Sequence, residues 1–277
     1  MSVSVRVGQG AAQVVFANNS PLAFIAGPCV IESEEHVLRM ADAIRDAAGA
    51  FVFKASFDKA NRTNLRSYRG PGLREGLRIL AQVRALGIPV LTDIHEPAHA
   101  AIAAEFVDIL QIPAFLCRQT DLLLEAGRTG RAVNIKKGQF VSPADFANAA
   151  EKVASTGNQR ILLTERGSSF GYNNLVVDMR GLRIMAETGY PVVFDATHSV
   201  QLPGASGAAS GGEPQFIEPL ARAATAVGIA GVFIEVHDCP ERALSDGPNA
   251  LRLDRLPQFL QHLRAIDDLV KAMAAAD

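Results

Sequence analysis

The sequence predicts a (β/α)8 barrel, an α/β fold in which eight parallel strands close into a cylinder surrounded by helices. Eight short runs of mostly Val, Ile, Leu and Phe recur along the 277 residues, which is typical of strands buried on both faces. Amphipathic stretches separate most of these runs, and an alternation of strand and helix indicates parallel βα units. Eight such units in a chain of this length match one barrel.

The first element expected along the chain is a β-hairpin. Residues 3–8 and 12–18 read as two short strands around Gly8 and Gly10. We expect this hairpin, within an N-terminal extension of residues 1–20, to close the bottom of the barrel. The whole chain, residues 1–277, is expected to be one barrel domain.

The barrel strands and their helices follow in alternation. The expected strands span residues 22–29, 51–56, 89–95, 108–113, 132–138, 160–167, 191–198 and 231–237. The clearest amphipathic stretches span residues 33–49, 72–87, 142–157, 213–228 and 255–273. Two connections, residues 56–71 and 199–214, are long for a barrel, and long loops in a compact domain usually carry function. The first is rich in cations, and the Gly, Ala and Ser of the second are typical of a mobile lid.

Composition excludes several classes of protein. Hydrophobic residues make up 48% of the chain, which is enough for a large core, and the net charge of −2 provides no general attraction to nucleic acid or an anionic membrane. No apolar run is as long as a membrane span, and the first residues lack the core of a signal peptide. Three cysteines, few and odd in number, favour a reducing compartment. We therefore expect a cytoplasmic protein that binds neither nucleic acid nor membrane.

Polar and ionisable residues stand at the ends of the expected strands. The carboxyl ends of barrel strands face the active site, whereas closure of a barrel requires only apolar strands. Polar and ionisable residues grouped at one rim of the barrel therefore predict an enzyme. The residues at these ends are Cys29, Lys54, Asp93, His95, Gln111, Lys136, Arg166, His198 and Glu235.

Four residues form a candidate metal site: Cys29, His198, Glu235 and Asp246, which lies in the loop after the eighth strand. The first, seventh and eighth strands are neighbours in a closed barrel, so these groups can converge. A thiolate, an imidazole and two carboxylates suit a borderline divalent ion such as Zn²⁺, Fe²⁺, Mn²⁺ or Co²⁺. In the competing interpretation Cys29 is simply a small buried hydrophobe, and spacing does not decide between the two.

A rival cluster of ligands occurs at the end of the last strand, in Glu235, His237, Asp238 and Cys239. Glu235, His237 and Cys239 share one face of an extended chain. The cluster is the weaker candidate because Asp238 and Cys239 lie beyond the strand.

Six cations fall at or just past strand ends, and phosphate or carboxylate groups are commonly held by such residues. Six are too many for one phosphate, so they favour two phosphorylated substrates, or a phosphate and a carboxylate. The six are Lys54, Lys59, Arg62, Arg118, Lys136 and Arg166. The alternative assigns some cations to the solvated surface, as expected for Lys137, or to structural pairs with Asp93 or Glu165. Lys54 and Lys136 are also placed to form a Schiff base with a carbonyl substrate.

Long, specific motifs cover nearly the whole chain. They read AGPCVIES (26–33), KASFDKANRT (54–63), TDIHEP (92–97), QIPAFLCRQTDLL (111–123), NIKKGQF (134–140), TERGSSFGYNNLVVDMR (164–180), DATHSVQLPG (195–204) and FIEVHDCPERALSDGPNAL (233–251). Together they resemble the 3-deoxy-D-manno-octulosonate 8-phosphate synthases. The resemblance implies a barrel, usually a homotetramer, that condenses phosphoenolpyruvate with D-arabinose 5-phosphate and water in lipopolysaccharide core biosynthesis. Phosphate is released by C–O cleavage.

Three positions refine the resemblance. The related 3-deoxy-D-arabino-heptulosonate 7-phosphate synthases carry KPRTS where this chain has KANRT at 59–63, and the additional Asn61 favours a five-carbon sugar. Metal-independent members have Asn at the position of Cys29 and Cys at the position of Ser245, so this chain resembles the metal-dependent class. Asp238 and Cys239 depart from the family, which often has Pro and an acidic or amide residue there.

The resemblance also implies a role for each candidate residue. Phosphoenolpyruvate is expected to be held by Lys59, Lys136 and Arg166, with Lys54, Ser56 and Gln111 nearby. The sugar phosphate is expected to be held by Asn61, Arg62 and Thr63, and by Arg118 from a neighbouring subunit, with Phe115 at the subunit boundary. A divalent ion of Mn, Fe, Co, Zn or Cd is expected on Cys29, His198, Glu235 and Asp246. The residues expected to take part in catalysis are Lys59, Asp93, His95 and Asp246.

Three alternatives stay open on the sequence. One is heptulosonate phosphate synthase, and another is a Schiff-base aldolase that uses Lys54 or Lys136. The third is a catalytically silent barrel that binds sugar phosphates. Retention of all four expected metal ligands together with the cations weighs against the third.

Overall fold

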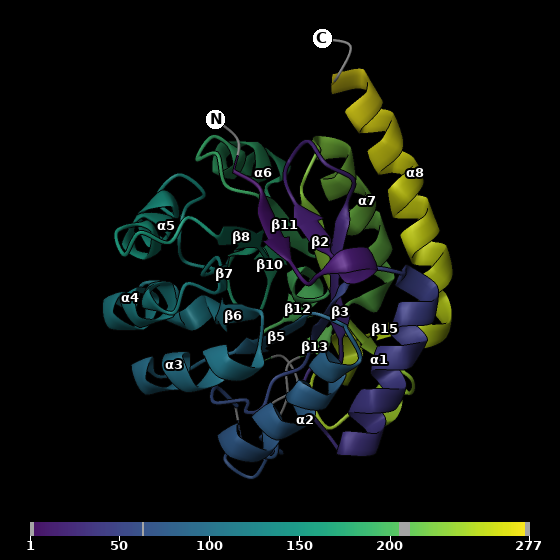
Figure 1. The fold of residues 1–277 in the computed structure, drawn as a ribbon. Helices are drawn as coiled ribbons and strands as arrows, with labels where there is room; N and C mark the ends of the chain where they lie inside the picture. Colours follow the sequence, from purple (N-terminus) through teal and green to yellow (C-terminus); the bar gives the residue numbers. More distant parts are fainter. Residues whose placement is uncertain (1–2, 63, 205–210, 275–277) are drawn as a thin grey trace.

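Eight parallel strands close into a barrel with helices around it (Figure 1) in the computed structural model, which describes residues 3–62, 64–204 and 211–274. Each strand pairs with the next along the chain, and the last pairs with both the seventh and the first. The strands are β3 (Ala23–Gly27), β4 (Val52–Lys54), β5 (Val90–Asp93), β6 (Ile109–Ile112), β7 (Ala132–Lys136), β8 (Ile161–Glu165), β11 (Val192–Asp195) and β14 (Gly231–His237). The predicted (β/α)8 barrel is confirmed.

Helices cover the outside of this barrel (Figure 1). They are α1 (Glu34–Ala48), α2 (Leu73–Ala85), α3 (Pro97–Phe106), α4 (Thr120–Arg128), α5 (Ala147–Ala154), α6 (Met179–Ala186), α7 (Ile217–Val227) and α8 (Leu256–Ala274). The buried face of each helix packs on the outward side chains of the strands in one large apolar cluster. Helix α5 begins later than the predicted 142–157 because the amides of residues 147–149 bond to carbonyls three residues back, as in turns, and not four.

Short strands and 3-10 helices occur outside the eight barrel strands and the eight helices. The additional strands are β9 (Ser168–Ser169), β10 (Leu175–Val176), β12 (Gln201–Leu202), β13 (Gly211–Gly212) and β15 (Leu251–Arg252). The 3-10 helices are η1 (Gly10–Ala12), η2 (Ala114–Leu116), η3 (His198–Val200), η4 (Pro214–Phe216), η5 (Pro240–Arg242), η6 (Gly247–Asn249) and η7 (Leu253–Arg255). Strands β12 and β13 form an antiparallel ribbon from the two flanks of the predicted lid, whose residues 205–210 lie outside the described part of the chain.

The predicted N-terminal hairpin consists of β1 (Val5–Val7) and β2 (Val14–Phe16), drawn in purple in Figure 1. Its inward residues Val5, Val7, Val14 and Phe16 are buried and share an apolar cluster with inward residues of the barrel strands. The Arg160 guanidinium, which precedes β8, donates to the Arg6 carbonyl at 2.8 Å. The hairpin therefore closes the end of the barrel at which the strands begin.

In the described ranges, no helix has both the length and the apolarity that a membrane crossing requires.

The hairpin contributes to stability through its buried aromatic ring. Phe16 is 0% exposed, so Phe16→Ala leaves a cavity against the barrel floor and is expected to lower the free energy of unfolding by about 3–5 kcal/mol. Val15 is only partly buried, so Val15→Ala is the control and should cost less than about 1 kcal/mol. Urea denaturation followed by circular dichroism measures both changes. Equal losses for the two variants would contradict a barrel floor closed by Phe16.

Candidate active site

A cavity of about 510 Å³ opens where the barrel strands end. Most of the site residues predicted from the sequence line it. They are Lys54, Lys59, Asn61, Arg62, Asp93, His95, Gln111, Phe115, Lys136, Arg166, His198 and Asp246. Arg118 does not line this cavity and is exposed, whereas Thr63 lies outside the described residues. Five of the six predicted cations therefore meet in one place.

The loop after β4 brings three of these residues over the cavity. The Lys59 amide donates to the Arg69 carbonyl at 2.7 Å, and the Arg69 side chain pairs with Asp58, so the loop folds back on itself. Arg62 then reaches the loop after β14, where it donates to the Ser245 hydroxyl at 2.7 Å and to the Leu244 carbonyl at 3.1 Å. Two loops far apart in the sequence thus share one wall of the cavity.

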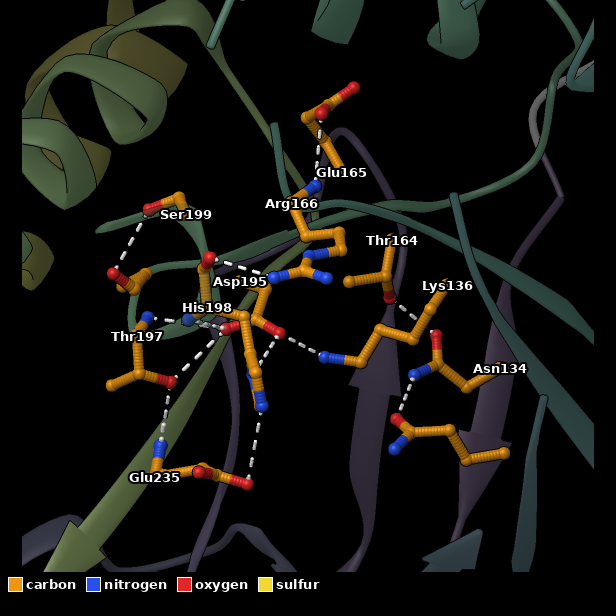
Figure 2. A network of polar contacts seen from close by, with 12 residues as sticks. Asn134, Lys136, Thr164, Glu165, Arg166, Asp195, Thr197, His198, Ser199 and Glu235 are labelled. Atoms are coloured by element: carbon orange, nitrogen blue, oxygen red, sulfur yellow. Dashed lines mark hydrogen bonds and ion pairs between the residues drawn. The ribbon is translucent and has the colours of Figure 1, made fainter. Parts of the chain in front are cut away.

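Asp195, at the end of β11, organises a second part of the site (Figure 2). Its carboxylate accepts hydrogen bonds from the Lys136 ammonium, from the His198 backbone amide at 2.8 Å and from Thr197. It also lies 2.7 Å from the His198 Nδ1. Burial opposes ionisation, but the neighbouring His198 and Lys136 hold the pKa of Asp195 well below its ordinary value. Sequence reasoning missed Asp195, although it stands in the predicted strand 191–198, because only His198 was taken as the end of that strand.

The contact with Asp195 determines which nitrogen His198 presents. With Nδ1 on the carboxylate, Nε2 faces Glu235 Oε1 at 3.6 Å (Figure 2). It also faces Asp246 Oδ2 at 3.9 Å. A carboxylate on one ring nitrogen is the usual device that orients a histidine toward a metal with the other. The prediction that His198 ends the strand is wrong, because His198 begins η3. The strand stops at Asp195 because the next residues turn to cap its carboxylate.

Cys29, Glu235 and Asp246 bring ligand atoms within 4.8 Å of one another. The Cys29 Sγ lies 3.2 Å from Asp246 Oδ2 and 3.0 Å from the Ser245 Oγ. Burial, then the charges of Asp246 and Glu235, raise the pKa of the Cys29 thiol well above its ordinary value. A thiol beside two carboxylates is not the apolar surrounding expected of a cysteine that serves only as a hydrophobe.

One atom of this group is left without a partner. Glu235 is fully buried, and its Oε2 has no hydrogen bond among the described residues, while Oε1 accepts from the Lys54 ammonium at 2.7 Å. Lys54 also donates to the Cys29 carbonyl at 2.6 Å. A buried carboxylate oxygen without a partner is costly, and a cation placed among Cys29, His198, Glu235 and Asp246 would satisfy it. The four predicted ligands therefore fit a borderline divalent ion.

A chain of buried polar side chains crosses the barrel below the cavity. Thr164 donates to Asn134 at 2.6 Å, Asn134 donates to Gln111 at 2.7 Å (Figure 2), and Gln111 donates to Asp93. Ser56 donates to the other oxygen of Asp93. Each of these side chains donates to the next, so the last member of the series must accept, and the Asp93 carboxylate does so. Neither Asn134 nor Thr164 was identified from the sequence.

Lys59 and Asp93 form one of the structural pairs considered from the sequence, at 3.9 Å. Burial acts against the charge on both, but Lys59 and then Lys54 lower the pKa of Asp93, while Cys29, Glu235 and Asp93 raise that of Lys59 well above its ordinary value. Lys136 behaves differently, because burial and the nearby Arg166 and Lys54 outweigh Asp195 and lower its pKa to about 8. Lys59 therefore keeps its positive charge.

The expectation that Lys137 is a solvated surface charge is wrong. Lys137 is 0% exposed, and its ammonium donates to the Ser168 hydroxyl at 3.1 Å and the Val141 carbonyl at 3.2 Å. It also lies 3.5 Å from Glu165, the second structural pair considered above. The loops after β7 and β8 cover the outer side of β7 at this height, so the side chain meets carbonyl groups instead of water.

Several residues that line the cavity have buried nitrogens without a partner among the described residues. The Nε atoms of Arg62 and Arg166 are buried without a hydrogen bond among the described residues, as is Nδ1 of His95. The Nη2 of Arg166 is anchored on the His198 carbonyl and the Gln201 side-chain oxygen at 2.9 Å each. Guanidinium groups held in place with free donors are suited to bind an anion.

The chain matches the model of the DAHP synthetase I family over residues 3–272. It is 61% identical over 265 residues to a 2-dehydro-3-deoxyphosphooctonate aldolase of Syntrophotalea carbinolica, which covers 94% of this chain and 96% of the relative. A protein of the same name from Geobacter sulfurreducens is 59% identical over 93% of this chain and 97% of the relative. One from Chelativorans sp. is 57% identical over 94% of this chain and 96% of the relative.

Proposed function

Because the chain belongs to the DAHP synthetase I family, we propose that it is an enzyme with the activity of its relatives. It condenses phosphoenolpyruvate with D-arabinose 5-phosphate and water to give 3-deoxy-D-manno-octulosonate 8-phosphate and phosphate, a transferase reaction of lipopolysaccharide core biosynthesis. The observation that carries this proposal is the identity of 57–61% to 2-dehydro-3-deoxyphosphooctonate aldolases over at least 93% of the chain. A cavity with five cations suits two phosphorylated substrates.

In the proposed mechanism, Lys59, Lys136 and Arg166 hold phosphoenolpyruvate through its carboxylate and phosphate. Asp195 keeps the Lys136 ammonium in position, and Gln201 and the His198 carbonyl do the same for Arg166. C3 of phosphoenolpyruvate forms the new bond to the aldehyde carbon of the sugar. Water then adds at C2, and the tetrahedral product loses phosphate by C–O cleavage.

Proton transfer is assigned to His95 and Asp246, which both line the cavity. His95 lines it with a buried Nδ1 that has no partner, and Asp246 lies beside it. Asp93 is held ionised by Lys59 and by donors from Ser56 and Gln111, so it can accept a proton but has none to give. We assign Asp93 first to orienting Lys59, whose firm positive charge faces the developing negative charge.

We propose that Cys29, His198, Glu235 and Asp246 hold a divalent ion of Mn, Fe, Co, Zn or Cd. The support is the proximity of their ligand atoms and the unpartnered oxygen of Glu235. A bound divalent ion supplies Lewis acidity that can polarise a carbonyl or lower the pKa of water. Asp195 orients His198 toward this site, and Lys54 neutralises one oxygen of Glu235.

The sugar phosphate is assigned to the loop after β4. Asn61 and Arg62 line the cavity, with Thr63 next along the chain. Arg62 spans from this loop to Ser245, so it sets the depth at which a distal phosphate docks. Phe115 lies at the rim of the same cavity and is 55% exposed.

We propose a homotetramer in which Arg118 completes the sugar-phosphate site of a neighbouring subunit. Arg118 is exposed, outside the cavity of its own chain, and follows the exposed Phe115. Phe140, Phe170 and Tyr172, on the loops after the next two barrel strands, are 61%, 69% and 97% exposed. Exposed aromatic residues beside an arginine are common at interfaces. A cytoplasmic location, also proposed, agrees with three free cysteines.

A phosphate-release assay tests the proposed reaction. With phosphoenolpyruvate and arabinose 5-phosphate the protein should release phosphate, and with erythrose 4-phosphate it should do so far more slowly. Borohydride added during turnover should not label Lys54 or Lys136, because no Schiff base forms. The proposal would be refuted if neither sugar led to phosphate release, or if a lysine were covalently trapped.

Metal dependence is the second prediction here. Chelation should abolish phosphate release, and Mn²⁺, Co²⁺ or Fe²⁺ should restore it. Cys29→Ala removes one proposed ligand and should lower the metal content by one ion per chain, measured by elemental analysis. Cys117→Ala is the matched control, because Cys117 is equally buried but lies outside the ligand cluster. Full activity in protein verified to be free of metal would contradict the assignment, and an unchanged content in Cys29→Ala would favour Cys239.

Specificity for the sugar is expected to reside in the loop after β4. Arg62→Ala removes charged hydrogen bonds worth about 1.5–3 kcal/mol and should raise KM for arabinose 5-phosphate roughly 10- to 100-fold, with a small effect on KM for phosphoenolpyruvate. Arg66→Ala, in the same loop but outside the cavity, is the control and should leave both KM values unchanged. Steady-state kinetics measure each value. An equal rise in both KM values for Arg62→Ala would remove Arg62 from the sugar site.

Mixed oligomers test whether Arg118 acts across an interface. Arg118→Ala and Lys136→Ala should each be poorly active alone. If Arg118 acts in the neighbour's site, a Lys136→Ala subunit can donate Arg118 to an Arg118→Ala subunit, so activity should rise above that of both parents after mixing. No recovery in oligomers verified to be mixed would place Arg118 in the site of its own subunit.

A further inference from the structure

A second group of metal-ligating side chains lies outside the cavity described above. It consists of Glu32, His36 and His237, whose ligand atoms lie within 4.8 Å of one another. Glu32 and His36 stand at the start of α1, and His237 is the last residue of β14. The two histidines are 7% and 5% exposed, and their ring centroids are 4.7 Å apart. None of the three lines the active-site cavity.

Asp238 orients both rings. Its Oδ1 lies 3.2 Å from His36 Nε2 and 3.1 Å from His237 Nδ1, and its Oδ2 accepts from Arg39 at 2.7 Å. Each ring therefore keeps one nitrogen that Asp238 does not contact. On His36 this is Nδ1, which is buried without a hydrogen-bond partner. On His237 it is Nε2, which lies 3.2 Å from Glu32 Oε1.

A carboxylate that accepts from one ring nitrogen fixes the tautomer and leaves the lone pair of the other nitrogen for an ion, which is the arrangement of His36. On His237 the Cys239 amide donates to Nδ1 at 2.9 Å, so Nε2 carries the proton toward Glu32, and an ion would take the place of that proton. Ligand atoms of a tetrahedral site with bonds of ~2.0–2.1 Å are about 3.3 Å apart, close to the 3.2 Å between Glu32 and His237.

We propose that Glu32, His36 and His237 form a second divalent-metal site, with Asp238 as the group that orients both histidines. Two imidazoles and a carboxylate suit Zn²⁺, and three protein ligands leave a fourth position for water. His237 binds through Nε2, and its Nδ1 proton faces Asp238. The Cys239 amide, which now donates to Nδ1 at 2.9 Å, turns away on binding. The unusual Asp238 of the sequence motif acquires a role here.

The ligands of this site tie together the two segments that frame the active site. Glu32 Oε1 also accepts from the Leu244 amide at 2.8 Å, two residues before Asp246. On the other side, Glu32 lies three residues after Cys29. An ion held by Glu32, His36 and His237 fixes both segments relative to each other without touching substrate.

Counting metal ions in the full-length untagged chain tests the proposal. In a Cys29→Ala background, which disables the first site, we expect one Zn²⁺ per chain after chelation, reloading and dialysis. Cys29→Ala/His36→Leu should hold none, and Cys29→Ala/Glu32→Gln should bind more weakly. Zn²⁺ should raise Tm in the Cys29→Ala protein but not in the His36→Leu version.

Cys29→Ala/His262→Leu is the matched control, because His262 also pairs with a glutamate but lies far along the chain on α8. It should keep one ion. The proposal is overturned if Cys29→Ala protein binds no Zn²⁺, or if the His36→Leu and His262→Leu versions bind equally. Glu32→Gln keeps an acceptor for the Leu244 amide. If His36→Leu does not fold, weaker Zn²⁺ binding by the Glu32→Gln version supports the site, and unchanged binding overturns it. The condensation activity of the wild type is measured separately, so failure of this site does not bear on the proposed reaction.

Discussion

Charge neutralisation at the mouth of the barrel is the constraint on which the rest of the structure depends. Glu235, Asp93, Asp195 and Glu165 are all buried, and moving an unpaired carboxylate out of water costs several kcal/mol. Each has a cation beside it, contributed by Lys54, Lys59, Lys136 or Lys137. Lys54 and Lys136 end strands β4 and β7, Lys137 directly follows β7, and Lys59 lies in the loop after β4, so the pairs hold each lysine in place near a strand end.

The same pairing leaves unequal cations at the cavity. Lys59 has a pKa well above its ordinary value, whereas burial lowers that of Lys136 to about 8 despite the contact with Asp195. Arg62 and Arg166 each keep a buried Nε without a partner among the described residues, while both terminal nitrogens of Arg62 and the Nη2 of Arg166 are anchored on the protein. Groups fixed before a substrate arrives lose little entropy on binding, and in a buried site their fields are only weakly screened.

The two groups of candidate metal ligands differ in what surrounds them. Asp246 and His198 line the cavity, with Cys29 and Glu235 close to them, so an ion held there would have access to substrate. Glu32, His36 and His237 lie behind it, with both histidines held by Asp238. The loop from His237 to Asp246 connects the two. Order in the second cluster therefore bears on the position of a ligand in the first.

The order of strands and helices, the closing hairpin and most residues of the cavity were predictable from the sequence. Apolar runs of fixed length and polar residues at their ends are local patterns, and closure of a barrel brings equivalent ends together. Asp195, the chain from Thr164 to Asp93, the burial of Lys137 and the contact of His36 with Asp238 were not predictable. Each depends on which side chains from separate strands or loops meet at the same height, and on whether a loop or water covers the outer face. Only the packed tertiary structure decides this, because burial sets the energetic value of a charge or a hydrogen bond, and burial is not a property of any one segment.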